Sequence, residues 1–278
     1  MPEPVSLQAR VEQLCAEFPG IAGVAAGNLA TGEEVSVNAR LSFPTASMIK
    51  IQILFELVRL CARGQAQMWE RVTLRREDKT LGSGLLVDLD DGLNLTLRDL
   101  AVLMMSISDN TATNILIDRL GRGAINAACR DAGMYDTELR GKIDFDRIRE
   151  SNDNLAVSTP HDFRTFLSAL HRGELIPGPY VEQILGIMRI QKYIEPMRKP
   201  LPFNPYGFEF GEPQEVWVAS KTGSLKGVRC ESGLVHTPRA TWALSVCTKE
   251  CEDNSWTSDN TGVRFISAVS RALYEVWG

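Results

Sequence analysis

The residues with the clearest chemical potential are Ser47 and Lys50, which form an S-x-x-K run. A serine and a lysine three residues apart lie on one face of a helix, where their side chains can hydrogen-bond. Pro44 marks a helix start just before Ser47, and the apolar run 51–60 predicts a buried helix. Burial among isoleucines lowers the pKa of a lysine, so Lys50 could act as a base toward Ser47. A lysine that extends from a helix edge into water is the simpler alternative.

A second polar run, Ser108-Asp109-Asn110, separates two apolar helical stretches, at 100–107 and 112–120. In this setting Ser108 could pass a proton to a leaving nitrogen, and Asn110 could hold a substrate amide. Asp109 could brace the loop. Ser, Asp and Asn are also the preferred N-cap residues, so the run could simply begin the second helix. Both interpretations can hold together.

A third run, Lys221-Thr222-Gly223, ends a predicted strand. Backbone N–H groups at a strand edge can form an oxyanion hole, so we expect the N–H of Ser224 to pair with that of Ser47. Lys221 and Thr222 would then bind a substrate carboxylate. A lysine that enters a turn at the glycine is the alternative without function.

In this order, the three runs resemble the signature of class A serine β-lactamases and penicillin-binding proteins. The resemblance implies opening of a β-lactam ring through an acyl-enzyme on Ser47. It also implies an α+β (α/β) fold of the β-lactamase and DD-peptidase kind, with an antiparallel sheet flanked by terminal helices and an inserted all-helical domain. Further segments carry the same resemblance along almost the whole chain: 82–84, 96–100, 111–114, 158–160 and 224–225.

One part of the family pattern is missing. Class A β-lactamases use a glutamate, in an E-x-x-L-N setting, for deacylation, and the segment before the Ser-Thr-Pro run lacks it. Asp144 lies nearest the expected position, and Asp146 and Glu150 are weaker candidates; a solvated loop carboxylate is the alternative. Arg229 lies about one residue out of register with a substrate-binding arginine of the family, and it could instead pair with Glu231.

The elements that must position these residues follow from the hydrophobic pattern. Strands from both ends of the chain that pair into one sheet would make the helical middle an insertion. We therefore expect one unit, in which 1–42 and 211–278 form a sheet-and-helix region, 43–210 form a helical region, and the active site lies between them. Helices are predicted over 5–18 and 260–276, and strands at 21–29, 35–37, 216–220, 232–236 and 241–247.

The composition and charge of the chain limit the classes of partner that it can bind. The 278 residues carry a formal net charge of −5 with scattered basic residues, which argues against nucleic acid. No apolar run approaches the ~18–20 residues of a membrane span, and no signal peptide is visible. This predicts a cytoplasmic protein, although a periplasmic or secreted protein without its export signal would look the same.

Six irregularly spaced cysteines and three histidines predict buried free thiols, with no metal and no cofactor. The oligomeric state stays open.

Three functions fit these residues. In the first, a small-molecule β-lactam is hydrolysed: Ser47 attacks, Lys50 activates it, and Ser108 protonates the nitrogen. The second is a penicillin-recognising esterase or peptidase for another acyl compound, which suits a chain without a visible export signal. The third is a binding or sensing module that stays acylated on Ser47, which the missing glutamate favours.

Overall fold

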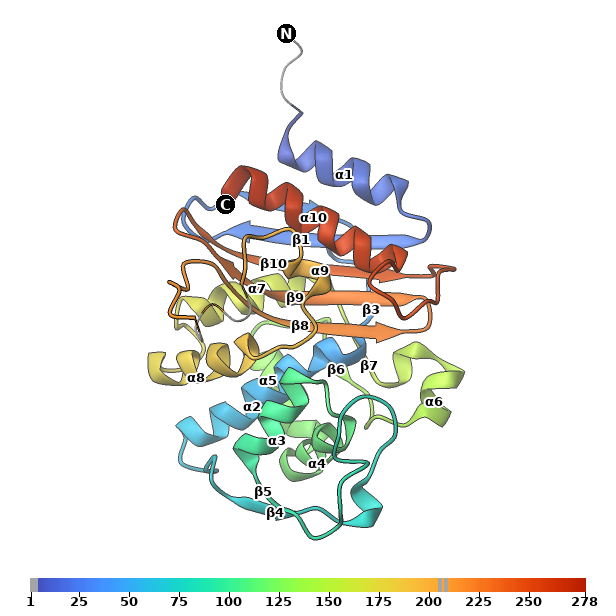
Figure 1. Cartoon of the computed structure of the whole chain (residues 1–278), viewed down its shortest axis with the longest axis vertical. Coiled ribbons are helices and arrows are strands. Elements are labelled where there is room, and N and C mark those ends of the chain that lie inside the picture. Colours follow the sequence, from blue (N-terminus) through green and yellow to red (C-terminus); the bar gives the residue numbers. More distant parts are fainter. Residues whose placement is uncertain (1–4, 205–206, 208–209) are drawn as a thin grey trace.

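The computed structural model describes residues 5–204, 207 and 210–278. Its central element is a five-stranded antiparallel sheet with the strand order β2-β1-β10-β9-β8 (Figure 1). Both ends of the chain supply this sheet, as the sequence predicts. Its strands are β1 (Ile21–Asn28), β2 (Glu34–Val37), β8 (Trp217–Leu225), β9 (Val228–His236) and β10 (Thr241–Lys249).

Helices cover both faces of the sheet (Figure 1). The terminal helices α1 (Leu7–Glu17) and α10 (Thr261–Trp277) pack together on one face, with the short α9 (Glu195–Arg198) beside α10. Helix α7 (Pro160–His171) packs on the opposite face, against β1, β9 and β10. Although α7 falls inside the expected helical region 43–210, its packing therefore ties it to the sheet.

The rest of the middle segment is a helical cluster around α2 (Lys50–Ala62). Every residue of α2 from Lys50 to Arg59 is buried, so the prediction of a buried helix after Ser47 is confirmed. Four helices surround it: α3 (Leu97–Ser106), α4 (Asn110–Leu120), α5 (Arg122–Asp131) and α8 (Gly178–Arg189). Helix α3 begins with a capping box, in which Thr96 accepts from Asp99 N and Asp99 accepts from Thr96 N.

Several short elements were not predicted, because two or three residues show no periodicity. A three-stranded sheet holds the chain just before Ser47 in the order β3-β7-β6, and β4 pairs with β5 at the far end of the helical cluster. They are β3 (Phe43–Pro44), β4 (Arg71–Thr73), β5 (Asn94–Thr96), β6 (Glu138–Leu139) and β7 (Ala156–Ser158), with helix α6 (Phe145–Glu150) and the 3-10 turns η1 (Ala46–Ile49), η2 (Arg76–Asp78) and η3 (Asn152–Asn154).

Strands β8, β9 and β10 are longer than predicted. Strand β8 continues to Leu225, so Lys221 and Gly223 lie within it rather than at its end. The prediction for β8 ended at Ser220 because Lys221 is a buried charged residue, which breaks an apolar pattern. Residues 1–4, 205–206 and 208–209 lie outside the described residues, so the start of the expected region 1–42 and the end of the region 43–210 are described only in part.

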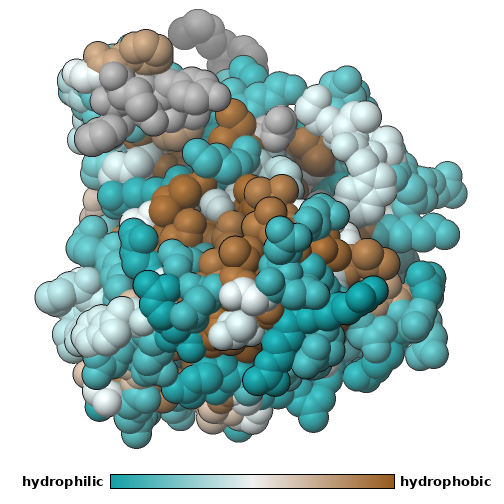
Figure 2. Space-filling model, turned by 60° about the horizontal axis from the view of Figure 1, so that its bottom comes forward, coloured by the Kyte–Doolittle hydropathy of each residue, from teal (hydrophilic) through white to brown (hydrophobic). Residues whose placement is uncertain are grey.

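The helical end of the molecule exposes apolar side chains, surrounded by hydrophilic ones (Figure 2). The connection between β4 and β5 lies at this end (Figure 1) and exposes Leu81, Leu85 and Leu89. Among the described residues, no helix is long and apolar enough to cross a membrane.

Candidate active site

Ser47 lies in the 3-10 turn η1, which leads directly into α2. The preceding residue, Ala46, has φ = +46°, a left-handed conformation that L-residues rarely adopt. Backbone strain of this kind persists only where the surrounding structure imposes it, and it clusters at functional sites. The Ser47 side chain is half-buried, and its hydroxyl makes no hydrogen bond to another described residue. It is therefore available to a substrate.

Lys50 is fully buried one turn after Ser47 and reaches the loop at 108–110. Its Nζ lies 2.8 Å from Ser108 O, 3.0 Å from Ser108 Oγ and 3.1 Å from Asn110 Oδ1. Burial is the main cause that lowers the pKa of Lys50 well below its usual value, and the positive charge of Lys221 lowers it further. A lowered pKa favours the neutral amine, which can accept a proton. The alternative of a lysine extending into water does not apply.

The loop that carries Ser108 is braced by Asp109. Its carboxylate accepts hydrogen bonds from Ala112 N (2.8 Å), Leu85 N (2.7 Å) and Leu86 N (2.9 Å). Asp109 is thus the N-cap of α4 and also holds the 82–86 loop, so the bracing and capping interpretations are both confirmed. A Cβ on Gly84 would lie 2.3 Å from this carboxylate, so the position requires glycine. Ser108 itself has φ = +59°, a second strained residue beside Lys50.

The third motif lies on β8, the edge strand of the sheet. Gly223 allows β8 to approach the turn before Ser47, because a Cβ there would lie 2.5 Å from Thr45 O. Lys221 is fully buried and its Nζ donates to Thr222 O (2.8 Å). Burial lowers the pKa of Lys221 to about 7, although the nearby Glu231 carboxylate opposes the shift.

The outer edge of β8 carries the proposed oxyanion donor. With the Gln191 amide assigned the orientation that satisfies its neighbours, its oxygen lies 3.1 Å from Thr222 N, so this N–H points away from β9. Backbone N–H groups two residues apart in a strand point to the same side. The N–H of Ser224 therefore points to the same free edge, beside the turn that carries Ser47. This geometry agrees with the predicted pairing of the two N–H groups.

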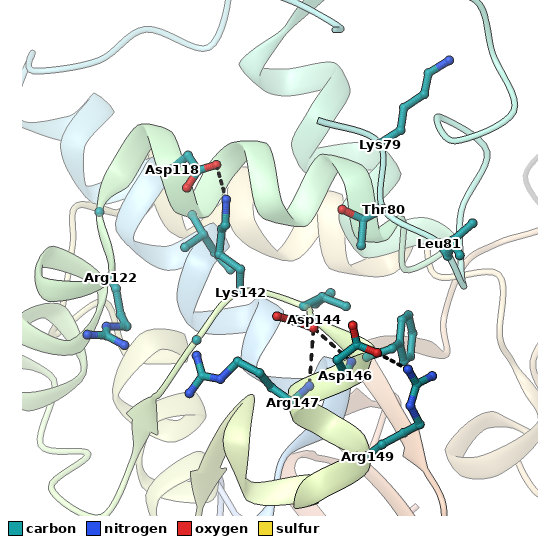
Figure 3. A pocket seen from close by; sticks show the side chains of 15 residues that line it. Lys79, Thr80, Leu81, Asp118, Arg122, Lys142, Asp144, Asp146, Arg147 and Arg149 are labelled. Carbon is teal, nitrogen blue, oxygen red and sulfur yellow. Dashed lines mark hydrogen bonds and ion pairs between the residues drawn. The ribbon is translucent and has the colours of Figure 1, made fainter. Parts of the chain in front are cut away.

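Asp144 is not brought into this group. It is exposed, and its Oδ1 caps α6 by accepting from Asp146 N (3.0 Å) and Arg147 N (3.4 Å). It lines an open pocket of about 750 Å³ that contains none of the three motifs. Figure 3 shows Asp146 in the same pocket, paired with Arg149. Glu150 is also exposed.

Other residues of this segment contact α4 instead. Asn114, one helical turn after Asn110, brackets the backbone of the buried Ile143: its Oδ1 accepts from Ile143 N (2.8 Å), and its Nδ2 donates to Ile143 O (2.9 Å). The ring of Phe145 lies near Asn110, because a Cβ on Gly82 would be 2.7 Å from Asn110 Nδ2 and 2.9 Å from Phe145 Cζ. The backbone of Ile143 and the ring of Phe145 therefore lie beside α4 here, whereas the Asp144 carboxylate caps α6.

Arg229 does not face the site, and this corrects the expectation that it binds substrate. Its guanidinium donates to Leu225 O (2.8 Å) and Val228 O (2.7 Å) and stacks on Trp256, 4.8 Å from the ring centre. The next residue, Cys230, contacts the turn before Ser47. Since neighbouring strand residues point to opposite faces, the Arg229 side chain lies on the other face of the sheet.

The alternative pairing of Arg229 with Glu231 is also not formed. The buried Glu231 carboxylate instead accepts from Ser220 Oγ (2.7 Å) and Met197 N (2.9 Å). Arg229 is therefore held on the far face of the sheet, and Glu231 is held by Ser220, the residue before Lys221.

Two residues that contact the site, Gln191 and Cys230, were not predicted from the sequence. Gln191 reaches both the segment before Ser108 and strand β8. Cys230 is a buried thiol, as expected, but its Sγ lies 2.9 Å from Thr45 O, directly before the strained turn. Gln191 follows the end of α8, so no helical periodicity indicates that it is buried at the site. The position of Cys230 could have been predicted only from its pairing with Gly223 in the sheet.

No group of three or more His, Cys, Asp or Glu side chains that could hold a metal ion occurs within the described ranges. The chemistry that the assembled side chains provide is that of a serine beside two buried lysines. Such an arrangement can form and transfer an acyl group through a covalent intermediate on the serine.

Comparison with known proteins agrees with this geometry. The model of the β-lactamase enzyme family matches residues 6–277. A β-lactamase from Sphaerobacter thermophilus DSM 20745 is 30% identical, with a TM-score of 0.84, and the match covers 98% of this chain and 97% of that one. The solved structure of PBP-A is 26% identical (TM-score 0.83; 97% and 94% covered). A β-lactamase from Chitinophaga pinensis DSM 2588, 18% identical (TM-score 0.86; 98% and 99% covered), shares the fold. With its three motifs assembled around Lys50, the chain belongs to the β-lactamase enzyme family.

Proposed function

We propose that this protein is a serine hydrolase that opens a β-lactam ring through an acyl-enzyme on Ser47 and releases the product slowly. The observation that carries the proposal is the position of Lys50. Its buried Nζ lies one turn from Ser47 and within 3.1 Å of Ser108 Oγ and Asn110 Oδ1. A neutral amine in this position can take a proton from one hydroxyl and return it through the other.

Acylation would proceed in two proton transfers. Ser47 Oγ attacks the lactam carbonyl carbon while its proton passes to Lys50 Nζ. The carbonyl oxygen becomes an oxyanion, which the N–H groups of Ser47 and Ser224 stabilise. The C–N bond then breaks, the nitrogen takes the proton of Ser108 Oγ, and Lys50 returns its proton to Ser108. The product is an ester on Ser47.

Substrate binding would use the β8 edge and the loop at 108–110. Lys221 supplies a positive charge for a substrate carboxylate while it is protonated, and Thr222 supplies a hydroxyl. Asn110 Nδ2 donates to Leu81 O (2.9 Å), which fixes the side chain that would contact a substrate amide.

Slow deacylation is proposed because the site lacks a carboxylate that could activate water. In the described part of the chain, no Asp or Glu side chain hydrogen-bonds to Lys50, Ser108 or Asn110. The carboxylate of Asp109 is occupied by three N–H groups. A general base typically contributes about 10²–10⁴-fold to the rate of such a step, so its absence prolongs the life of the ester.

A solved relative supports the substrate class. A structure described as a mutant of PBP-A in an acyl-enzyme complex with penicillin G is 26% identical to this chain, with 97% of this chain and 95% of that chain covered. A penicillin is therefore the first substrate to test here.

The test is intact-protein mass spectrometry after mixing with penicillin G, together with nitrocefin hydrolysis. We expect the native protein to gain the mass of one penicillin, and Ser47→Ala to gain none. An adduct that decays over minutes, with matching nitrocefin turnover, would support the proposal. No adduct on the native protein, or an equal adduct on Ser47→Ala, would contradict it.

A second candidate is an esterase or peptidase of the penicillin-recognising group that acts on another acyl compound. The apolar Ile143 favours it, because an acyl group that reacts slowly with water can instead be passed to an amine. Turnover of a thioester or peptide substrate, accelerated by an added amine while nitrocefin is only bound, would favour this function. An adduct that persists for hours on every substrate would favour the sensing module.

A further inference from the structure

Gln191 is a buried amide between the two walls of the site. It follows α8, and only 2% of the residue is exposed. We assign its amide the orientation that satisfies both neighbours: Nε2 then donates to Ser106 O (3.2 Å), and Oε1 accepts from Thr222 N (3.1 Å). Ser106 ends the helix that leads to Ser108, and Thr222 lies two residues before Ser224. One side chain therefore joins the segment of the proton donor to the strand of the oxyanion donor.

The backbone around Gln191 is fixed on both sides. Lys192 N donates to Ser106 O (2.9 Å), and Tyr193 Oη donates to Ile107 O (3.3 Å). The buried guanidinium of Arg198 donates to Gln191 O (2.6 Å). The amide is thus held in place before a substrate arrives, which is what a positioning group requires.

The two walls need such a link because they belong to different parts of the fold. Ser108 follows a helix of the helical cluster, whereas Ser224 lies on β8, whose outer edge has no neighbouring strand among the described residues. An edge strand presents N–H groups without partners. Gln191 satisfies the one at Thr222 and leaves the one at Ser224 free for an oxyanion. Ser108 is also strained, with φ = +59°, so the segment before it must be held.

We propose that Gln191 is a positioning residue that sets the spacing between Ser108 and the Ser224 N–H, and so controls the rate of acylation. This rests on the proposed function, because it assumes the acyl-enzyme on Ser47. Gln191 does not touch the reacting atoms. It acts through Ser106 on one wall and Thr222 on the other. Its loss is expected to lower the acylation rate constant and to change the noncovalent dissociation constant little.

The test measures saturation kinetics of penicillin acylation for Gln191→Met and Gln191→Glu. Methionine keeps the length and removes both hydrogen bonds, and we expect a fall of about 30-fold in the acylation rate constant for two lost bonds. Glutamate keeps the acceptor for Thr222 N and, when ionised, loses the donor to Ser106 O. Its rate relative to the native protein should rise as the pH falls and the carboxyl group becomes protonated.

The matched control is Gln52→Met. Gln52 is a fully buried glutamine on α2 whose amide has no hydrogen-bond partner in the described structure. We expect its acylation rate constant to stay within about twofold, because no hydrogen bond is lost. This separates the loss of the link from the general effect of a buried Gln→Met change.

The outcomes distinguish the two proposals. No adduct on the native protein overturns the proposed function, and with it the role of Gln191. A native adduct together with an unchanged rate constant in Gln191→Met overturns the role of Gln191 alone. The same holds if only the dissociation constant changes. If Gln191→Met does not fold, the pH dependence of Gln191→Glu decides: a constant ratio to the native rate overturns the inference.

Discussion

Two buried lysines, Lys50 and Lys221, dominate the chemistry of the site at the scale of single residues. Desolvation lowers the pKa of both lysines, yet the proposed mechanism needs them in opposite protonation states. In the proposed mechanism, Lys50 must be neutral to accept a proton from Ser47, whereas Lys221 must be charged to hold a carboxylate. The pH range of activity is therefore bounded on the acid side by Lys50 and on the alkaline side by Lys221.

This predicts a specific pH profile. For penicillin G, which carries a carboxylate, we expect kcat/KM to fall as the pH rises through about 7, because Lys221 then loses its proton. As the pH falls, protonation of Lys50 removes the base. Lys221→Arg keeps its charge at all accessible pH values and should lose the alkaline limb. An identical alkaline limb in this variant would show that another group titrates there.

The residue that limits turnover is expected to be Ile143, whose backbone is held by Asn114 one helical turn from Asn110. We predict that Ile143→Glu speeds hydrolysis of the penicillin ester at least about tenfold, because it supplies a carboxylate that can activate water at this side of the site. The measurement is the decay of the adduct by mass spectrometry after removal of free penicillin. Asp144→Asn is the control. Its amide oxygen can still cap α6, so we expect unchanged decay.

Slower decay in Asp144→Asn would instead support the sequence-based expectation that Asp144 is the deacylating base. Equal decay in Ile143→Glu and the native protein would show that a carboxylate at this place does not reach the water.

At the scale of elements, the site depends on how the 82–86 loop and α4 are joined. The Asp109 carboxylate accepts one hydrogen bond from the first turn of α4 and two from the loop, and Asn110 N donates to Ser83 O (2.9 Å). The chain just before the loop in turn supports Asn110, because Leu81 O accepts from Asn110 Nδ2. A single carboxylate thus fixes both the helix start and one wall of the site.

We predict that Asp109→Ala lowers the free energy of unfolding by about 3 kcal/mol, since it removes an N-cap and leaves two further N–H groups without their acceptor. Urea unfolding followed by circular dichroism measures this. Asp118→Ala removes an exposed ion pair with Lys142 and should cost less than about 1 kcal/mol. Equal losses in the two variants would contradict the special role of Asp109.

At the scale of the whole molecule, the sheet and its terminal helices act as a frame. Trp277, at the end of α10, is 4% exposed and lies 6.2 Å from Trp242, centre to centre. Its indole N–H donates to Glu33 Oε2 (2.7 Å), near the start of β2. The last turn of α10 is thereby fixed to the hairpin of β1 and β2, on the face of the sheet that α7 does not cover.

We predict that Trp277→Ala lowers the free energy of unfolding by about 3 kcal/mol or more but leaves the acylation rate constant of the folded protein unchanged. Val276→Ala, at an exposed neighbour, should change stability by less than about 0.5 kcal/mol. Unfolding and penicillin acylation are measured on the same samples. A large fall in the acylation rate constant at a temperature where Trp277→Ala is folded would contradict this prediction, because it would show that the packing of α10 on the sheet affects the geometry of the site.

The sequence by itself predicted the proposed nucleophile and its neighbours, and it determined the order of elements. Ser47, Lys50, Ser108 and Lys221 could be found because each lies in a short run whose spacing is set by local geometry. The antiparallel sheet built from both chain ends could be found because strand periodicity and helix caps are local signals.

Only the tertiary structure decided which residues from distant parts of the sequence lie near the three motifs and which face away from them. Arg229 faces away because the register of β8 and β9 sets which side of the sheet each residue faces, and a shift of one residue reverses it. Asp144 and Ile143 are adjacent in sequence, but Asn114 on α4 determines which of them is held against that helix. Gln191 joins Ser106 to Thr222 across long chain separations. Such contacts depend on how helices pack against the sheet, and no local pattern encodes them.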